Sequence, residues 1–267
     1  KTFTLQYPSL LFPGESQTVA TPPPADLRIR RCVNTVNPLD WLSVGRTIRR
    51  ERPDFVLLKY WTPFMAPCFG TIARLARGNG HTKVLCQIDN VEPHERHLSD
   101  RPFNRYFLSS VDGFIYMSEQ VHRELRAYTA APALFSPHPL FENFGERVPR
   151  AEACGRLGLD PALRYVLFFG LVRDYKGLDL LLGAWALLKR RGRTEGRRLI
   201  VAGEFYTAKE PYLKQIAASG LQEEVLLHDR FIPDAGVKDY FSAADFVVQP
   251  YKTATQSGVT QIAYQFC

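Results

Sequence analysis

The prediction of the fold starts from the stretch Val166-Leu-Phe-Phe-Gly-Leu-Val-Arg-Asp-Tyr-Lys-Gly177. Its first four residues form a short apolar run, rich in β-branched and aromatic side chains, which predicts a buried strand. Gly170 ends this strand, and residues 178–188 then show the apolar spacing of a helix. The stretch therefore predicts a strand, a glycine turn that carries two cations, and a helix.

The two cations of this turn indicate an anion site. Arg173 and Lys176 lie three residues apart, and Gly177 allows the backbone to turn into the helix. The N–H groups at a helix start offer donors and a partial positive charge, and Arg and Lys add full charges. We therefore predict that the turn binds phosphate. The alternative is a basic surface loop in which Arg173 pairs with Asp174 or Asp179.

Size and composition favour two domains. The chain has 267 residues, of which 45% are hydrophobic, and this length suffices for two separate cores. No run of 18 apolar residues and no signal-peptide pattern occurs. The sequence begins at Lys1, and residues 258–267 predict a helix without a stop signal. We interpret the chain as a fragment of a longer protein and expect it to be inactive or unstable alone.

Cysteine usage and charge narrow the classes of partner. The five cysteines are scattered and form neither CxxC nor a Cys/His ligand pattern, which predicts reduced thiols in a cytoplasmic protein. A formal charge of +7 favours an anionic partner: nucleotide phosphates, a phospholipid surface or nucleic acid. The basic residues are not interleaved with aromatic residues on one element, which argues against nucleic acid. Cytoplasmic localisation is expected, and the charge is compatible with peripheral contact at the inner face of the membrane.

Strands and helices alternate along both halves of the chain, after a Pro-rich segment, residues 1–26, that is predicted to be a loop. The predicted strands are 27–35, 54–60, 83–88, 111–117, 164–169, 198–202, 224–227 and 245–249. The predicted helices are 38–50, 66–77, 104–110, one capped by Ser118, 151–157, 177–191, 208–219, 236–243 and one from 258. The Pro-, Gly- and charge-rich stretch 136–161 separates two domains, 1–145 and 146–267.

This alternation predicts an α/β protein with two Rossmann-like, doubly wound domains that face a cleft. Both domains are expected to be incomplete: the first lacks its first strand, and the second is truncated. Ligands of such sheets bind beyond the carboxyl ends of the strands, so the cleft is the expected site.

Several motifs of the second half, in this order, resemble the donor domain of retaining glycosyltransferases of family 4, which have the GT-B fold. The matching motifs are Phe169-Gly170 with Arg173 and Lys176-Gly177, Leu199-Ile-Val-Ala-Gly-Glu204, Phe231-Ile-Pro233, and Tyr240-Phe-Ser-Ala-Ala-Asp-Phe-Val-Val-Gln-Pro250. The resemblance covers residues 164–267. In the first half, Asp89-Asn-Val-Glu-Pro-His-Glu95 stands where the family often has an acceptor-side loop with a His near the sugar.

The resemblance implies transfer of a hexosyl or related sugar from a nucleotide sugar to a glycan or lipid-linked acceptor, with retention of configuration. No Asp-x-Asp occurs, so neither a metal nor any cofactor beyond the nucleotide-sugar co-substrate is expected. Nucleic acid is not an expected partner. The residues predicted to act in catalysis are His94, Arg173 and Lys176. The residues predicted to bind the donor are Gly170, Arg173, Lys176, Glu204, Phe231, Ile232, Gln256, Ser257, Gly258, Val259 and Gln261.

Two features depart from the family. Arg173 comes three residues after the glycine instead of directly after it. The two family glutamates that hold the sugar and the ribose are absent, and Gln256 and Gln261 are the nearest polar substitutes, without charge. A non-catalytic sugar-nucleotide-binding or scaffold protein is therefore an alternative, as is a nucleotide-sugar epimerase of the same fold. Three further residues are candidates: Lys252 for phosphate binding, and Tyr60 and Trp61 for stacking on an acceptor or for core or rim packing.

Overall fold

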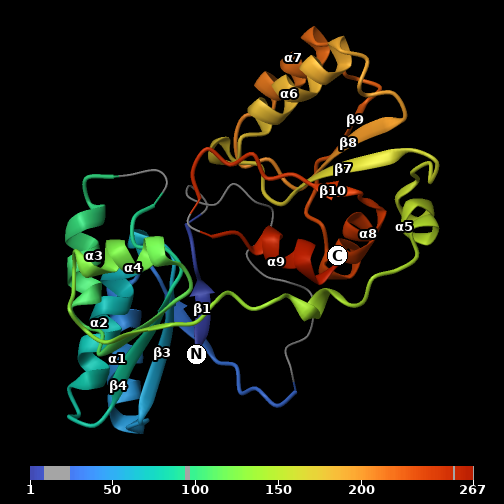
Figure 1. The fold of residues 1–267 in the computed structure, drawn as a ribbon. Helices are drawn as coiled ribbons and strands as arrows, with labels where there is room; N and C mark the ends of the chain where they lie inside the picture. Colours follow the sequence, from blue (N-terminus) through green and yellow to red (C-terminus); the bar gives the residue numbers. More distant parts are fainter. Residues whose placement is uncertain (9–24, 94–96, 255, 267) are drawn as a thin grey trace. The chain divides into compact units, whose positions relative to one another are not determined.

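The structure, a computed structural model, describes residues 1–8, 25–93, 97–254 and 256–266. The chain divides into two compact units, Lys1–Pro137 and His138–Cys267. Each unit is a parallel α/β structure (Figure 1). The units part after Pro137, whereas the sequence places its domain boundary after residue 145.

The N-terminal unit contains a four-stranded parallel sheet in the order β3-β4-β5-β6. These strands are β3 (Phe55–Tyr60), β4 (Lys83–Ile88), β5 (Gly113–Tyr116) and β6 (Ala133–Phe135). A separate two-stranded parallel sheet pairs β1 (Thr2–Leu5) with β2 (Arg31–Asn34). Buried side chains alternate along β4, as expected for a strand in contact with a core.

Helices cover the sheet of this unit and supply most of its core (Figure 1). They are α1 (Pro38–Glu51), the 3-10 turn η2 (Pro63–Met65), α2 (Ala66–Arg77), α3 (Asp100–Leu108) and α4 (Glu119–Arg126). The Asn37 side chain accepts a hydrogen bond from the Leu39 N–H at the start of α1, and Pro38 occupies the first helical position. The apolar side of α2 buries Ile72 against the same core.

The C-terminal unit has a four-stranded parallel sheet in the order β10-β7-β8-β9. The strands are β7 (Arg164–Phe169), β8 (Arg197–Ala202), β9 (Val225–His228) and β10 (Phe246–Val247). The chain builds the sheet outward from β7 to β9 and then returns to place β10 on the other side of β7. This reversal makes the carboxyl end of β7 a topological switch point, where doubly wound sheets bind ligands.

Two separate cores flank this sheet. The first lies under α6 (Leu178–Arg190) and α7 (Glu210–Ala218), which lie side by side in Figure 1. The second lies under α5 (Arg150–Leu157), α8 (Asp234–Ala243) and α9 (Gly258–Gln265). Two 3-10 turns, η3 (Glu142–Phe144) and η4 (Asp174–Lys176), complete the unit. The helices on both faces confirm the doubly wound arrangement predicted for this half of the chain.

Two strands were missing from the sequence-based prediction. The prediction of a loop over residues 1–26 is wrong at Thr2–Leu5, which pairs with β2 although Pro-rich sequence follows it. The strand Ala133–Phe135 was not predicted, because three residues are too few to show an alternating pattern.

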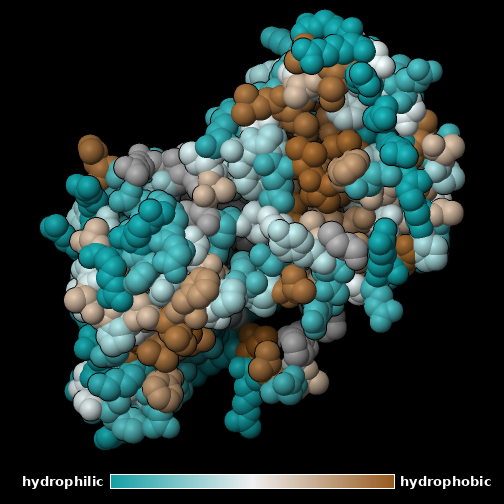
Figure 2. All heavy atoms as spheres, viewed as in Figure 1, coloured by the Kyte–Doolittle hydropathy of each residue, from teal (hydrophilic) through white to brown (hydrophobic). Residues whose placement is uncertain are grey.

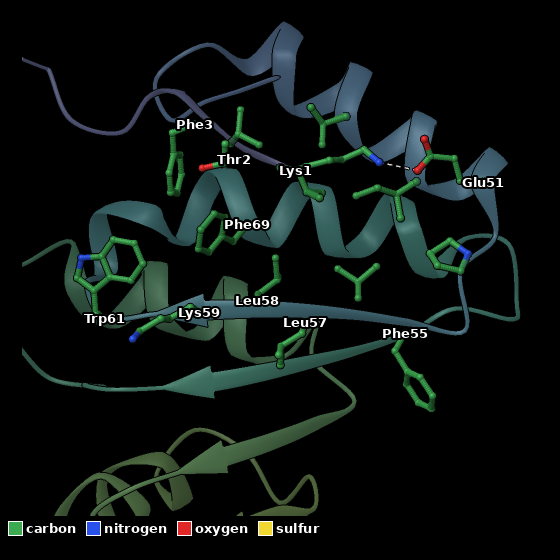
Figure 3. Close-up of a pocket in the computed structure, with 16 residues that line it drawn as sticks. Lys1, Thr2, Phe3, Glu51, Phe55, Leu57, Leu58, Lys59, Trp61 and Phe69 are labelled. Atoms are coloured by element: carbon green, nitrogen blue, oxygen red, sulfur yellow. Dashed lines mark hydrogen bonds and ion pairs between the residues drawn. The ribbon is translucent and has the colours of Figure 1, made fainter. Parts of the chain in front are cut away.

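A cavity of about 490 Å³ lies between β1 and β3 in the N-terminal unit (Figure 3). Phe3, Leu58 and Phe69 line it, and Lys1 forms an ion pair with Glu51 at its rim. The edge of β3 away from β4 pairs with no strand among the described residues. Phe55 and Leu57, on one face of this edge strand, are 65% and 59% exposed.

The C-terminal unit also exposes apolar side chains, such as Leu188 of α6 and Phe246 of β10. Figure 2 shows hydrophobic side chains gathered below the α6–α7 pair. Leu188 and Phe246 line a cavity of about 620 Å³, which lies at the amino end of β7, beside Arg164. This cavity therefore lies at the opposite end of β7 from the predicted phosphate turn. Within the described ranges, none of the helices has the length and apolar character needed to cross a bilayer.

Candidate functional site

Three segments converge at the carboxyl end of β7. Gly170 follows the strand with φ +94°, in the left-handed region that favours glycine. A Cβ atom placed on Gly170 would lie 3.1 Å from Nζ of Lys176 and 3.6 Å from Cγ2 of Val259. The Lys176 amine therefore folds back over Gly170, and the first turn of α9 packs against the same point. The structure thus brings Gly170 and Lys176 together with Val259, which comes much later in the sequence and also belongs to the predicted donor residues.

The loops after β7 and β8 are joined by main-chain hydrogen bonds. The Val172 N–H donates to the Glu204 carbonyl at 2.8 Å, and the Tyr206 N–H donates to the Val172 carbonyl at 2.9 Å. Val172 and Phe205 form an isolated parallel bridge, so the two segments pair again beyond the ends of the strands. This pairing holds Glu204, a predicted donor residue, beside the loop that carries Arg173.

The segment after β10 packs against the turn η4 and explains why Gly177 is a glycine. Gly177 has φ +70°, and a Cβ atom there would lie 2.1 Å from the carbonyl oxygen of Pro250. The Lys252 N–H donates to the Tyr175 carbonyl at 2.7 Å in the same contact. A larger residue at position 177 would push the two segments apart and displace Lys176.

The two cations of the turn lie against aromatic rings. The Arg173 guanidinium carbon is 5.1 Å from the centre of the Tyr206 ring, and Nζ of Lys176 is 5.7 Å from the centre of the Tyr251 ring. Burial, and after it the charge of Arg173, lowers the pKa of Lys176 to about 8. Two close positive charges in a partly desolvated place attract an anion more strongly than they would in water.

Lys252, and neither Arg173 nor Lys176, pairs with the carboxylates near this turn. Nζ of Lys252 lies 3.1 Å from Oδ1 of Asp174 and 2.9 Å from Oδ2 of Asp179. The alternative in which Arg173 pairs with one of these carboxylates is therefore wrong. Among the residues that the structure describes, no carboxylate forms an ion pair with Arg173 or Lys176. Lys252, a candidate phosphate ligand by sequence, makes these two ion pairs instead.

The start of α9 adds main-chain donors to the site. Ser257 precedes the helix in an extended conformation, and its Oγ lies 3.3 Å from the Tyr251 hydroxyl. The first N–H groups of a helix have no partner within the helix, so those at Gly258 and Val259 can serve a ligand. Because Val259 lies against Gly170, these donors lie near the same point as the Lys176 amine.

The other residues predicted from the sequence differ in their burial and in their place in the fold. Ile232 is 8% exposed and belongs to the core of the unit, so only its main chain can meet a ligand, whereas Phe231 is 54% exposed. Gln256 and Gln261 are half-buried, before and within α9. His94 lies outside the described residues. Tyr60 is fully buried and its hydroxyl donates to Oδ1 of Asn104 at 2.5 Å, so it packs in the core and does not stack on an acceptor.

Sequence reasoning missed Tyr206 and Tyr251, the two aromatic partners of the cations. Tyr206 lies four residues after the predicted strand that ends at Ala202, and Tyr251 directly follows Pro250. Each therefore follows a strand at the ligand-binding edge, and this position was the signal that could have identified it. Burial, and after it the negative charge of Glu204, raises the pKa of the Tyr206 hydroxyl.

A doubly wound parallel sheet defines a Rossmann-like domain, and the basic glycine turn at its switch point is its candidate anion site. Residues 164–265 match the family described as "Glycosyl transferases group 1". The match covers most of the C-terminal unit, and the solved structures below share the GT-B fold with this chain.

One curated relative is the D-inositol 3-phosphate glycosyltransferase of Pseudarthrobacter chlorophenolicus. It is 30% identical over 110 residues, which are 41% of this chain and 26% of the relative. The chain therefore spans about a quarter of the curated relative that it matches.

Similar solved structures have low sequence identity. Sucrose-phosphate synthase from Thermosynechococcus elongatus has a TM-score of 0.61 at 18% identity, over 76% of this chain and 52% of that protein. HepE from Anabaena in complex with UDP has a TM-score of 0.66 at 15% identity, over 83% of this chain and 59% of HepE. WaaG, a glycosyltransferase involved in lipopolysaccharide biosynthesis, has a TM-score of 0.59 at 12% identity, over 84% of this chain and 74% of WaaG.

Proposed function

We propose that the chain is part of a retaining, metal-independent glycosyltransferase that moves a sugar from a nucleotide-sugar donor to a glycan or lipid-linked acceptor. No cofactor beyond the nucleotide sugar is part of this proposal. The observation that carries it is the pair Arg173 and Lys176, which lie at the switch point of the sheet without a carboxylate partner among the described residues. The group 1 domain match and the likeness to HepE, solved with UDP, support a nucleoside diphosphate as the anion.

In this proposal, negative charge grows on the diphosphate as its bond to the sugar breaks. The Arg173 guanidinium, the Lys176 ammonium and the first N–H groups of α9 stabilise that charge. With a pKa of about 8, Lys176 is mostly protonated at neutral pH, and a bound anion favours its charged form further. Gly177 lies close to the Pro250 carbonyl, and Gly203 lies close to the Gly170 carbonyl. These contacts fix the loop before the donor arrives, so little reorganisation is needed.

The sugar contacts are proposed for residues at the rim of the same point. Glu204 is half-buried and near Tyr206, and it is the acidic residue of the predicted donor set. Gln256 and Gln261 would act as hydrogen-bonding groups for sugar or ribose hydroxyls in place of the family's glutamates. The proposed acceptor-side role of His94 follows from its motif in the first half of the sequence.

A thermal-shift screen of the full-length protein against UDP, GDP, ADP and dTDP tests the donor site. A ligand that binds only the folded state raises the melting temperature by mass action. We expect one nucleotide to stabilise the wild type but not the double variant Arg173→Ala with Lys176→Ala. The matched control is Arg190→Ala with Lys214→Ala, which removes the same charge from exposed positions on α6 and α7 and should leave the shift intact.

A second measurement separates the enzyme from its non-catalytic alternative, which the missing glutamates motivate. The nucleotide sugar of the base selected by the screen is incubated with the protein, and released nucleoside diphosphate is measured. A transferase releases it slowly by hydrolysis, and faster with a suitable acceptor. Binding without any release would favour the scaffold. No stabilisation by any of the four nucleotides would refute the assigned donor site.

A further inference from the structure

Lys252 is bound to the candidate site through both its main chain and its side chain. Its N–H donates to the Tyr175 carbonyl at 2.7 Å, which fixes the position of the residue relative to η4. Its ammonium group then reaches Oδ1 of Asp174 at 3.1 Å and Oδ2 of Asp179 at 2.9 Å. One cation therefore joins the segment after β10 to the turn η4 and to the first turn of α6.

The two carboxylates occupy positions where they could oppose anion binding. Asp174 directly follows Arg173 and lies two residues before Lys176. Asp179 lies in the first turn of α6, where a negative charge offsets the positive potential of the helix start. A phosphate that approaches this point would meet both negative charges if nothing neutralised them.

Asp179 depends on Lys252 more than Asp174 does. The Asp174 side chain is 74% exposed, so water solvates its charge well, whereas the Asp179 side chain is 39% exposed. Oδ1 of Asp179 is buried and accepts no hydrogen bond within the described part of the chain. Without Lys252, Asp179 would be a partly buried anion, and Arg173 and Lys176 would be the cations available to it.

We propose that Lys252 is a positioning residue for donor binding: by holding the carboxylates of Asp174 and Asp179, it leaves Arg173 and Lys176 free for the donor diphosphate. The inference rests on the proposed function of the site. In this proposal Lys252 does not bind the donor itself. Its ammonium group already pairs with both carboxylates, and it acts on donor binding through them.

The test is titration calorimetry of the full-length protein with the nucleoside diphosphate that the thermal screen selects. Replacing Lys252 by Met should weaken the affinity about 3- to 10-fold, the range expected for one partly exposed charge interaction. Adding Asp174→Asn and Asp179→Asn to Lys252→Met should restore the affinity to within about twofold of the wild type. Lys252→Arg, which keeps the charge, should bind as the wild type does.

This set of variants separates the proposal from two other roles of Lys252. If Lys252 touched the phosphate itself, removing the carboxylates would not restore binding. If the ion pairs only tethered the segments, the triple variant, which lacks both ion pairs, would bind as weakly as Lys252→Met. Either result overturns the proposal, as does an unchanged affinity of Lys252→Met.

A charge-matched pair completes the experiment. Lys252→Met with Asp179→Asn and Lys252→Met with Glu223→Gln have the same net charge, but Glu223 is exposed and precedes the amino end of β9. Only the variant with Asp179→Asn should regain affinity, and equal recovery in both would refute a local effect. Failure of the wild type to bind any nucleoside diphosphate would instead refute the proposed function, so the two failures are distinguishable.

Discussion

The α-carbon of Gly203 lies so close to the carbonyl oxygen of Gly170 that a Cβ atom on Gly203 would be 2.3 Å from that oxygen. Gly203 also has φ +141°, a conformation that side chains of L-residues rarely adopt. The contact joins the loops after β7 and β8, where the candidate site is built. The space between two predicted donor segments is thus limited by main-chain atoms, which cannot move aside as a side chain can.

We therefore expect Gly203→Ala to destabilise the protein by about 2–4 kcal/mol, through backbone strain and the clash with Gly170. Gly155→Ala is the control, because Gly155 lies within α5 and a Cβ atom there meets nothing within 4 Å. That change should be neutral or stabilise by about 0.5–1 kcal/mol. Urea denaturation measures both, and equal effects of the two substitutions would contradict the importance of the Gly170–Gly203 contact.

Burial of the Lys176 ammonium group should lower the stability of the folded protein, although the same group is proposed to bind the donor. Its pKa is lowered to about 8, so folding disfavours its charged form, and this cost is fully present below pH 8. The cost declines as pH rises from about 8 through the ordinary value of 10.5, and above that pH the side chain is neutral in both states. We expect Lys176→Met to raise the free energy of unfolding at pH 7 by roughly 1–3 kcal/mol, and by less at pH 9.5.

The control for this prediction is Lys214→Met, at an exposed position on α7. It should change the free energy of unfolding little at either pH. A loss of stability in Lys176→Met at pH 7 would show that its packing against Tyr251 outweighs the cost of burying its charge.

His228 should make the C-terminal unit sensitive to acid. Its Nδ1 lies 2.7 Å from the Tyr240 hydroxyl, and burial, followed by the charge of Arg230, lowers the pKa of the imidazole below 6.5. Protonation therefore favours the unfolded state, and stability falls as pH decreases from 6.5 through the lowered pKa. We expect the melting temperature of His228→Gln to fall less between pH 7 and pH 5.5 than that of the wild type. An equal fall in the variant and in the wild type would contradict this prediction.

Asn104 should be the most sensitive polar residue in the core of the N-terminal unit. It is 1% exposed, accepts the Tyr60 hydroxyl at 2.5 Å and donates to the Val91 carbonyl at 2.7 Å. Asn104→Leu leaves both partners buried and unpaired, so we expect a loss of about 2–5 kcal/mol, whereas Tyr60→Phe should cost about 1–2 kcal/mol. Denaturation curves of both variants check the order, and a larger loss in Tyr60→Phe would contradict it.

Much of the fold could be predicted from local patterns. The helix predicted at residues 66–77 and the strand predicted at 83–88 have the observed bounds, because each shows a clear period of apolar residues. The predicted strand at 245–249 is only Phe246–Val247 in the structure. The β1 strand was missed because two apolar residues in alternation, Phe3 and Leu5, carry little signal beside Pro-rich sequence.

The candidate site was predictable in position but not in its contacts. Spacing alone identified Arg173 and Lys176, since a strand, a glycine turn and a helix are local features. The pairing of Lys252 with Asp179 joins residues far apart in the sequence, and only the return of the chain to β10 brings them together. The pattern of charges around the turn therefore depends on sheet topology, which no single stretch of sequence encodes.

The unpaired edge of β3 has a consequence for how the chain behaves in solution. Its backbone hydrogen-bonding groups on that side meet no strand among the described residues, and Phe55 and Leu57 project from it into solvent. An exposed apolar edge of this kind is a template for pairing with extended segments of other molecules. We therefore expect the border of β3 to favour self-association of the polypeptide in solution, separately from the packing of its two units.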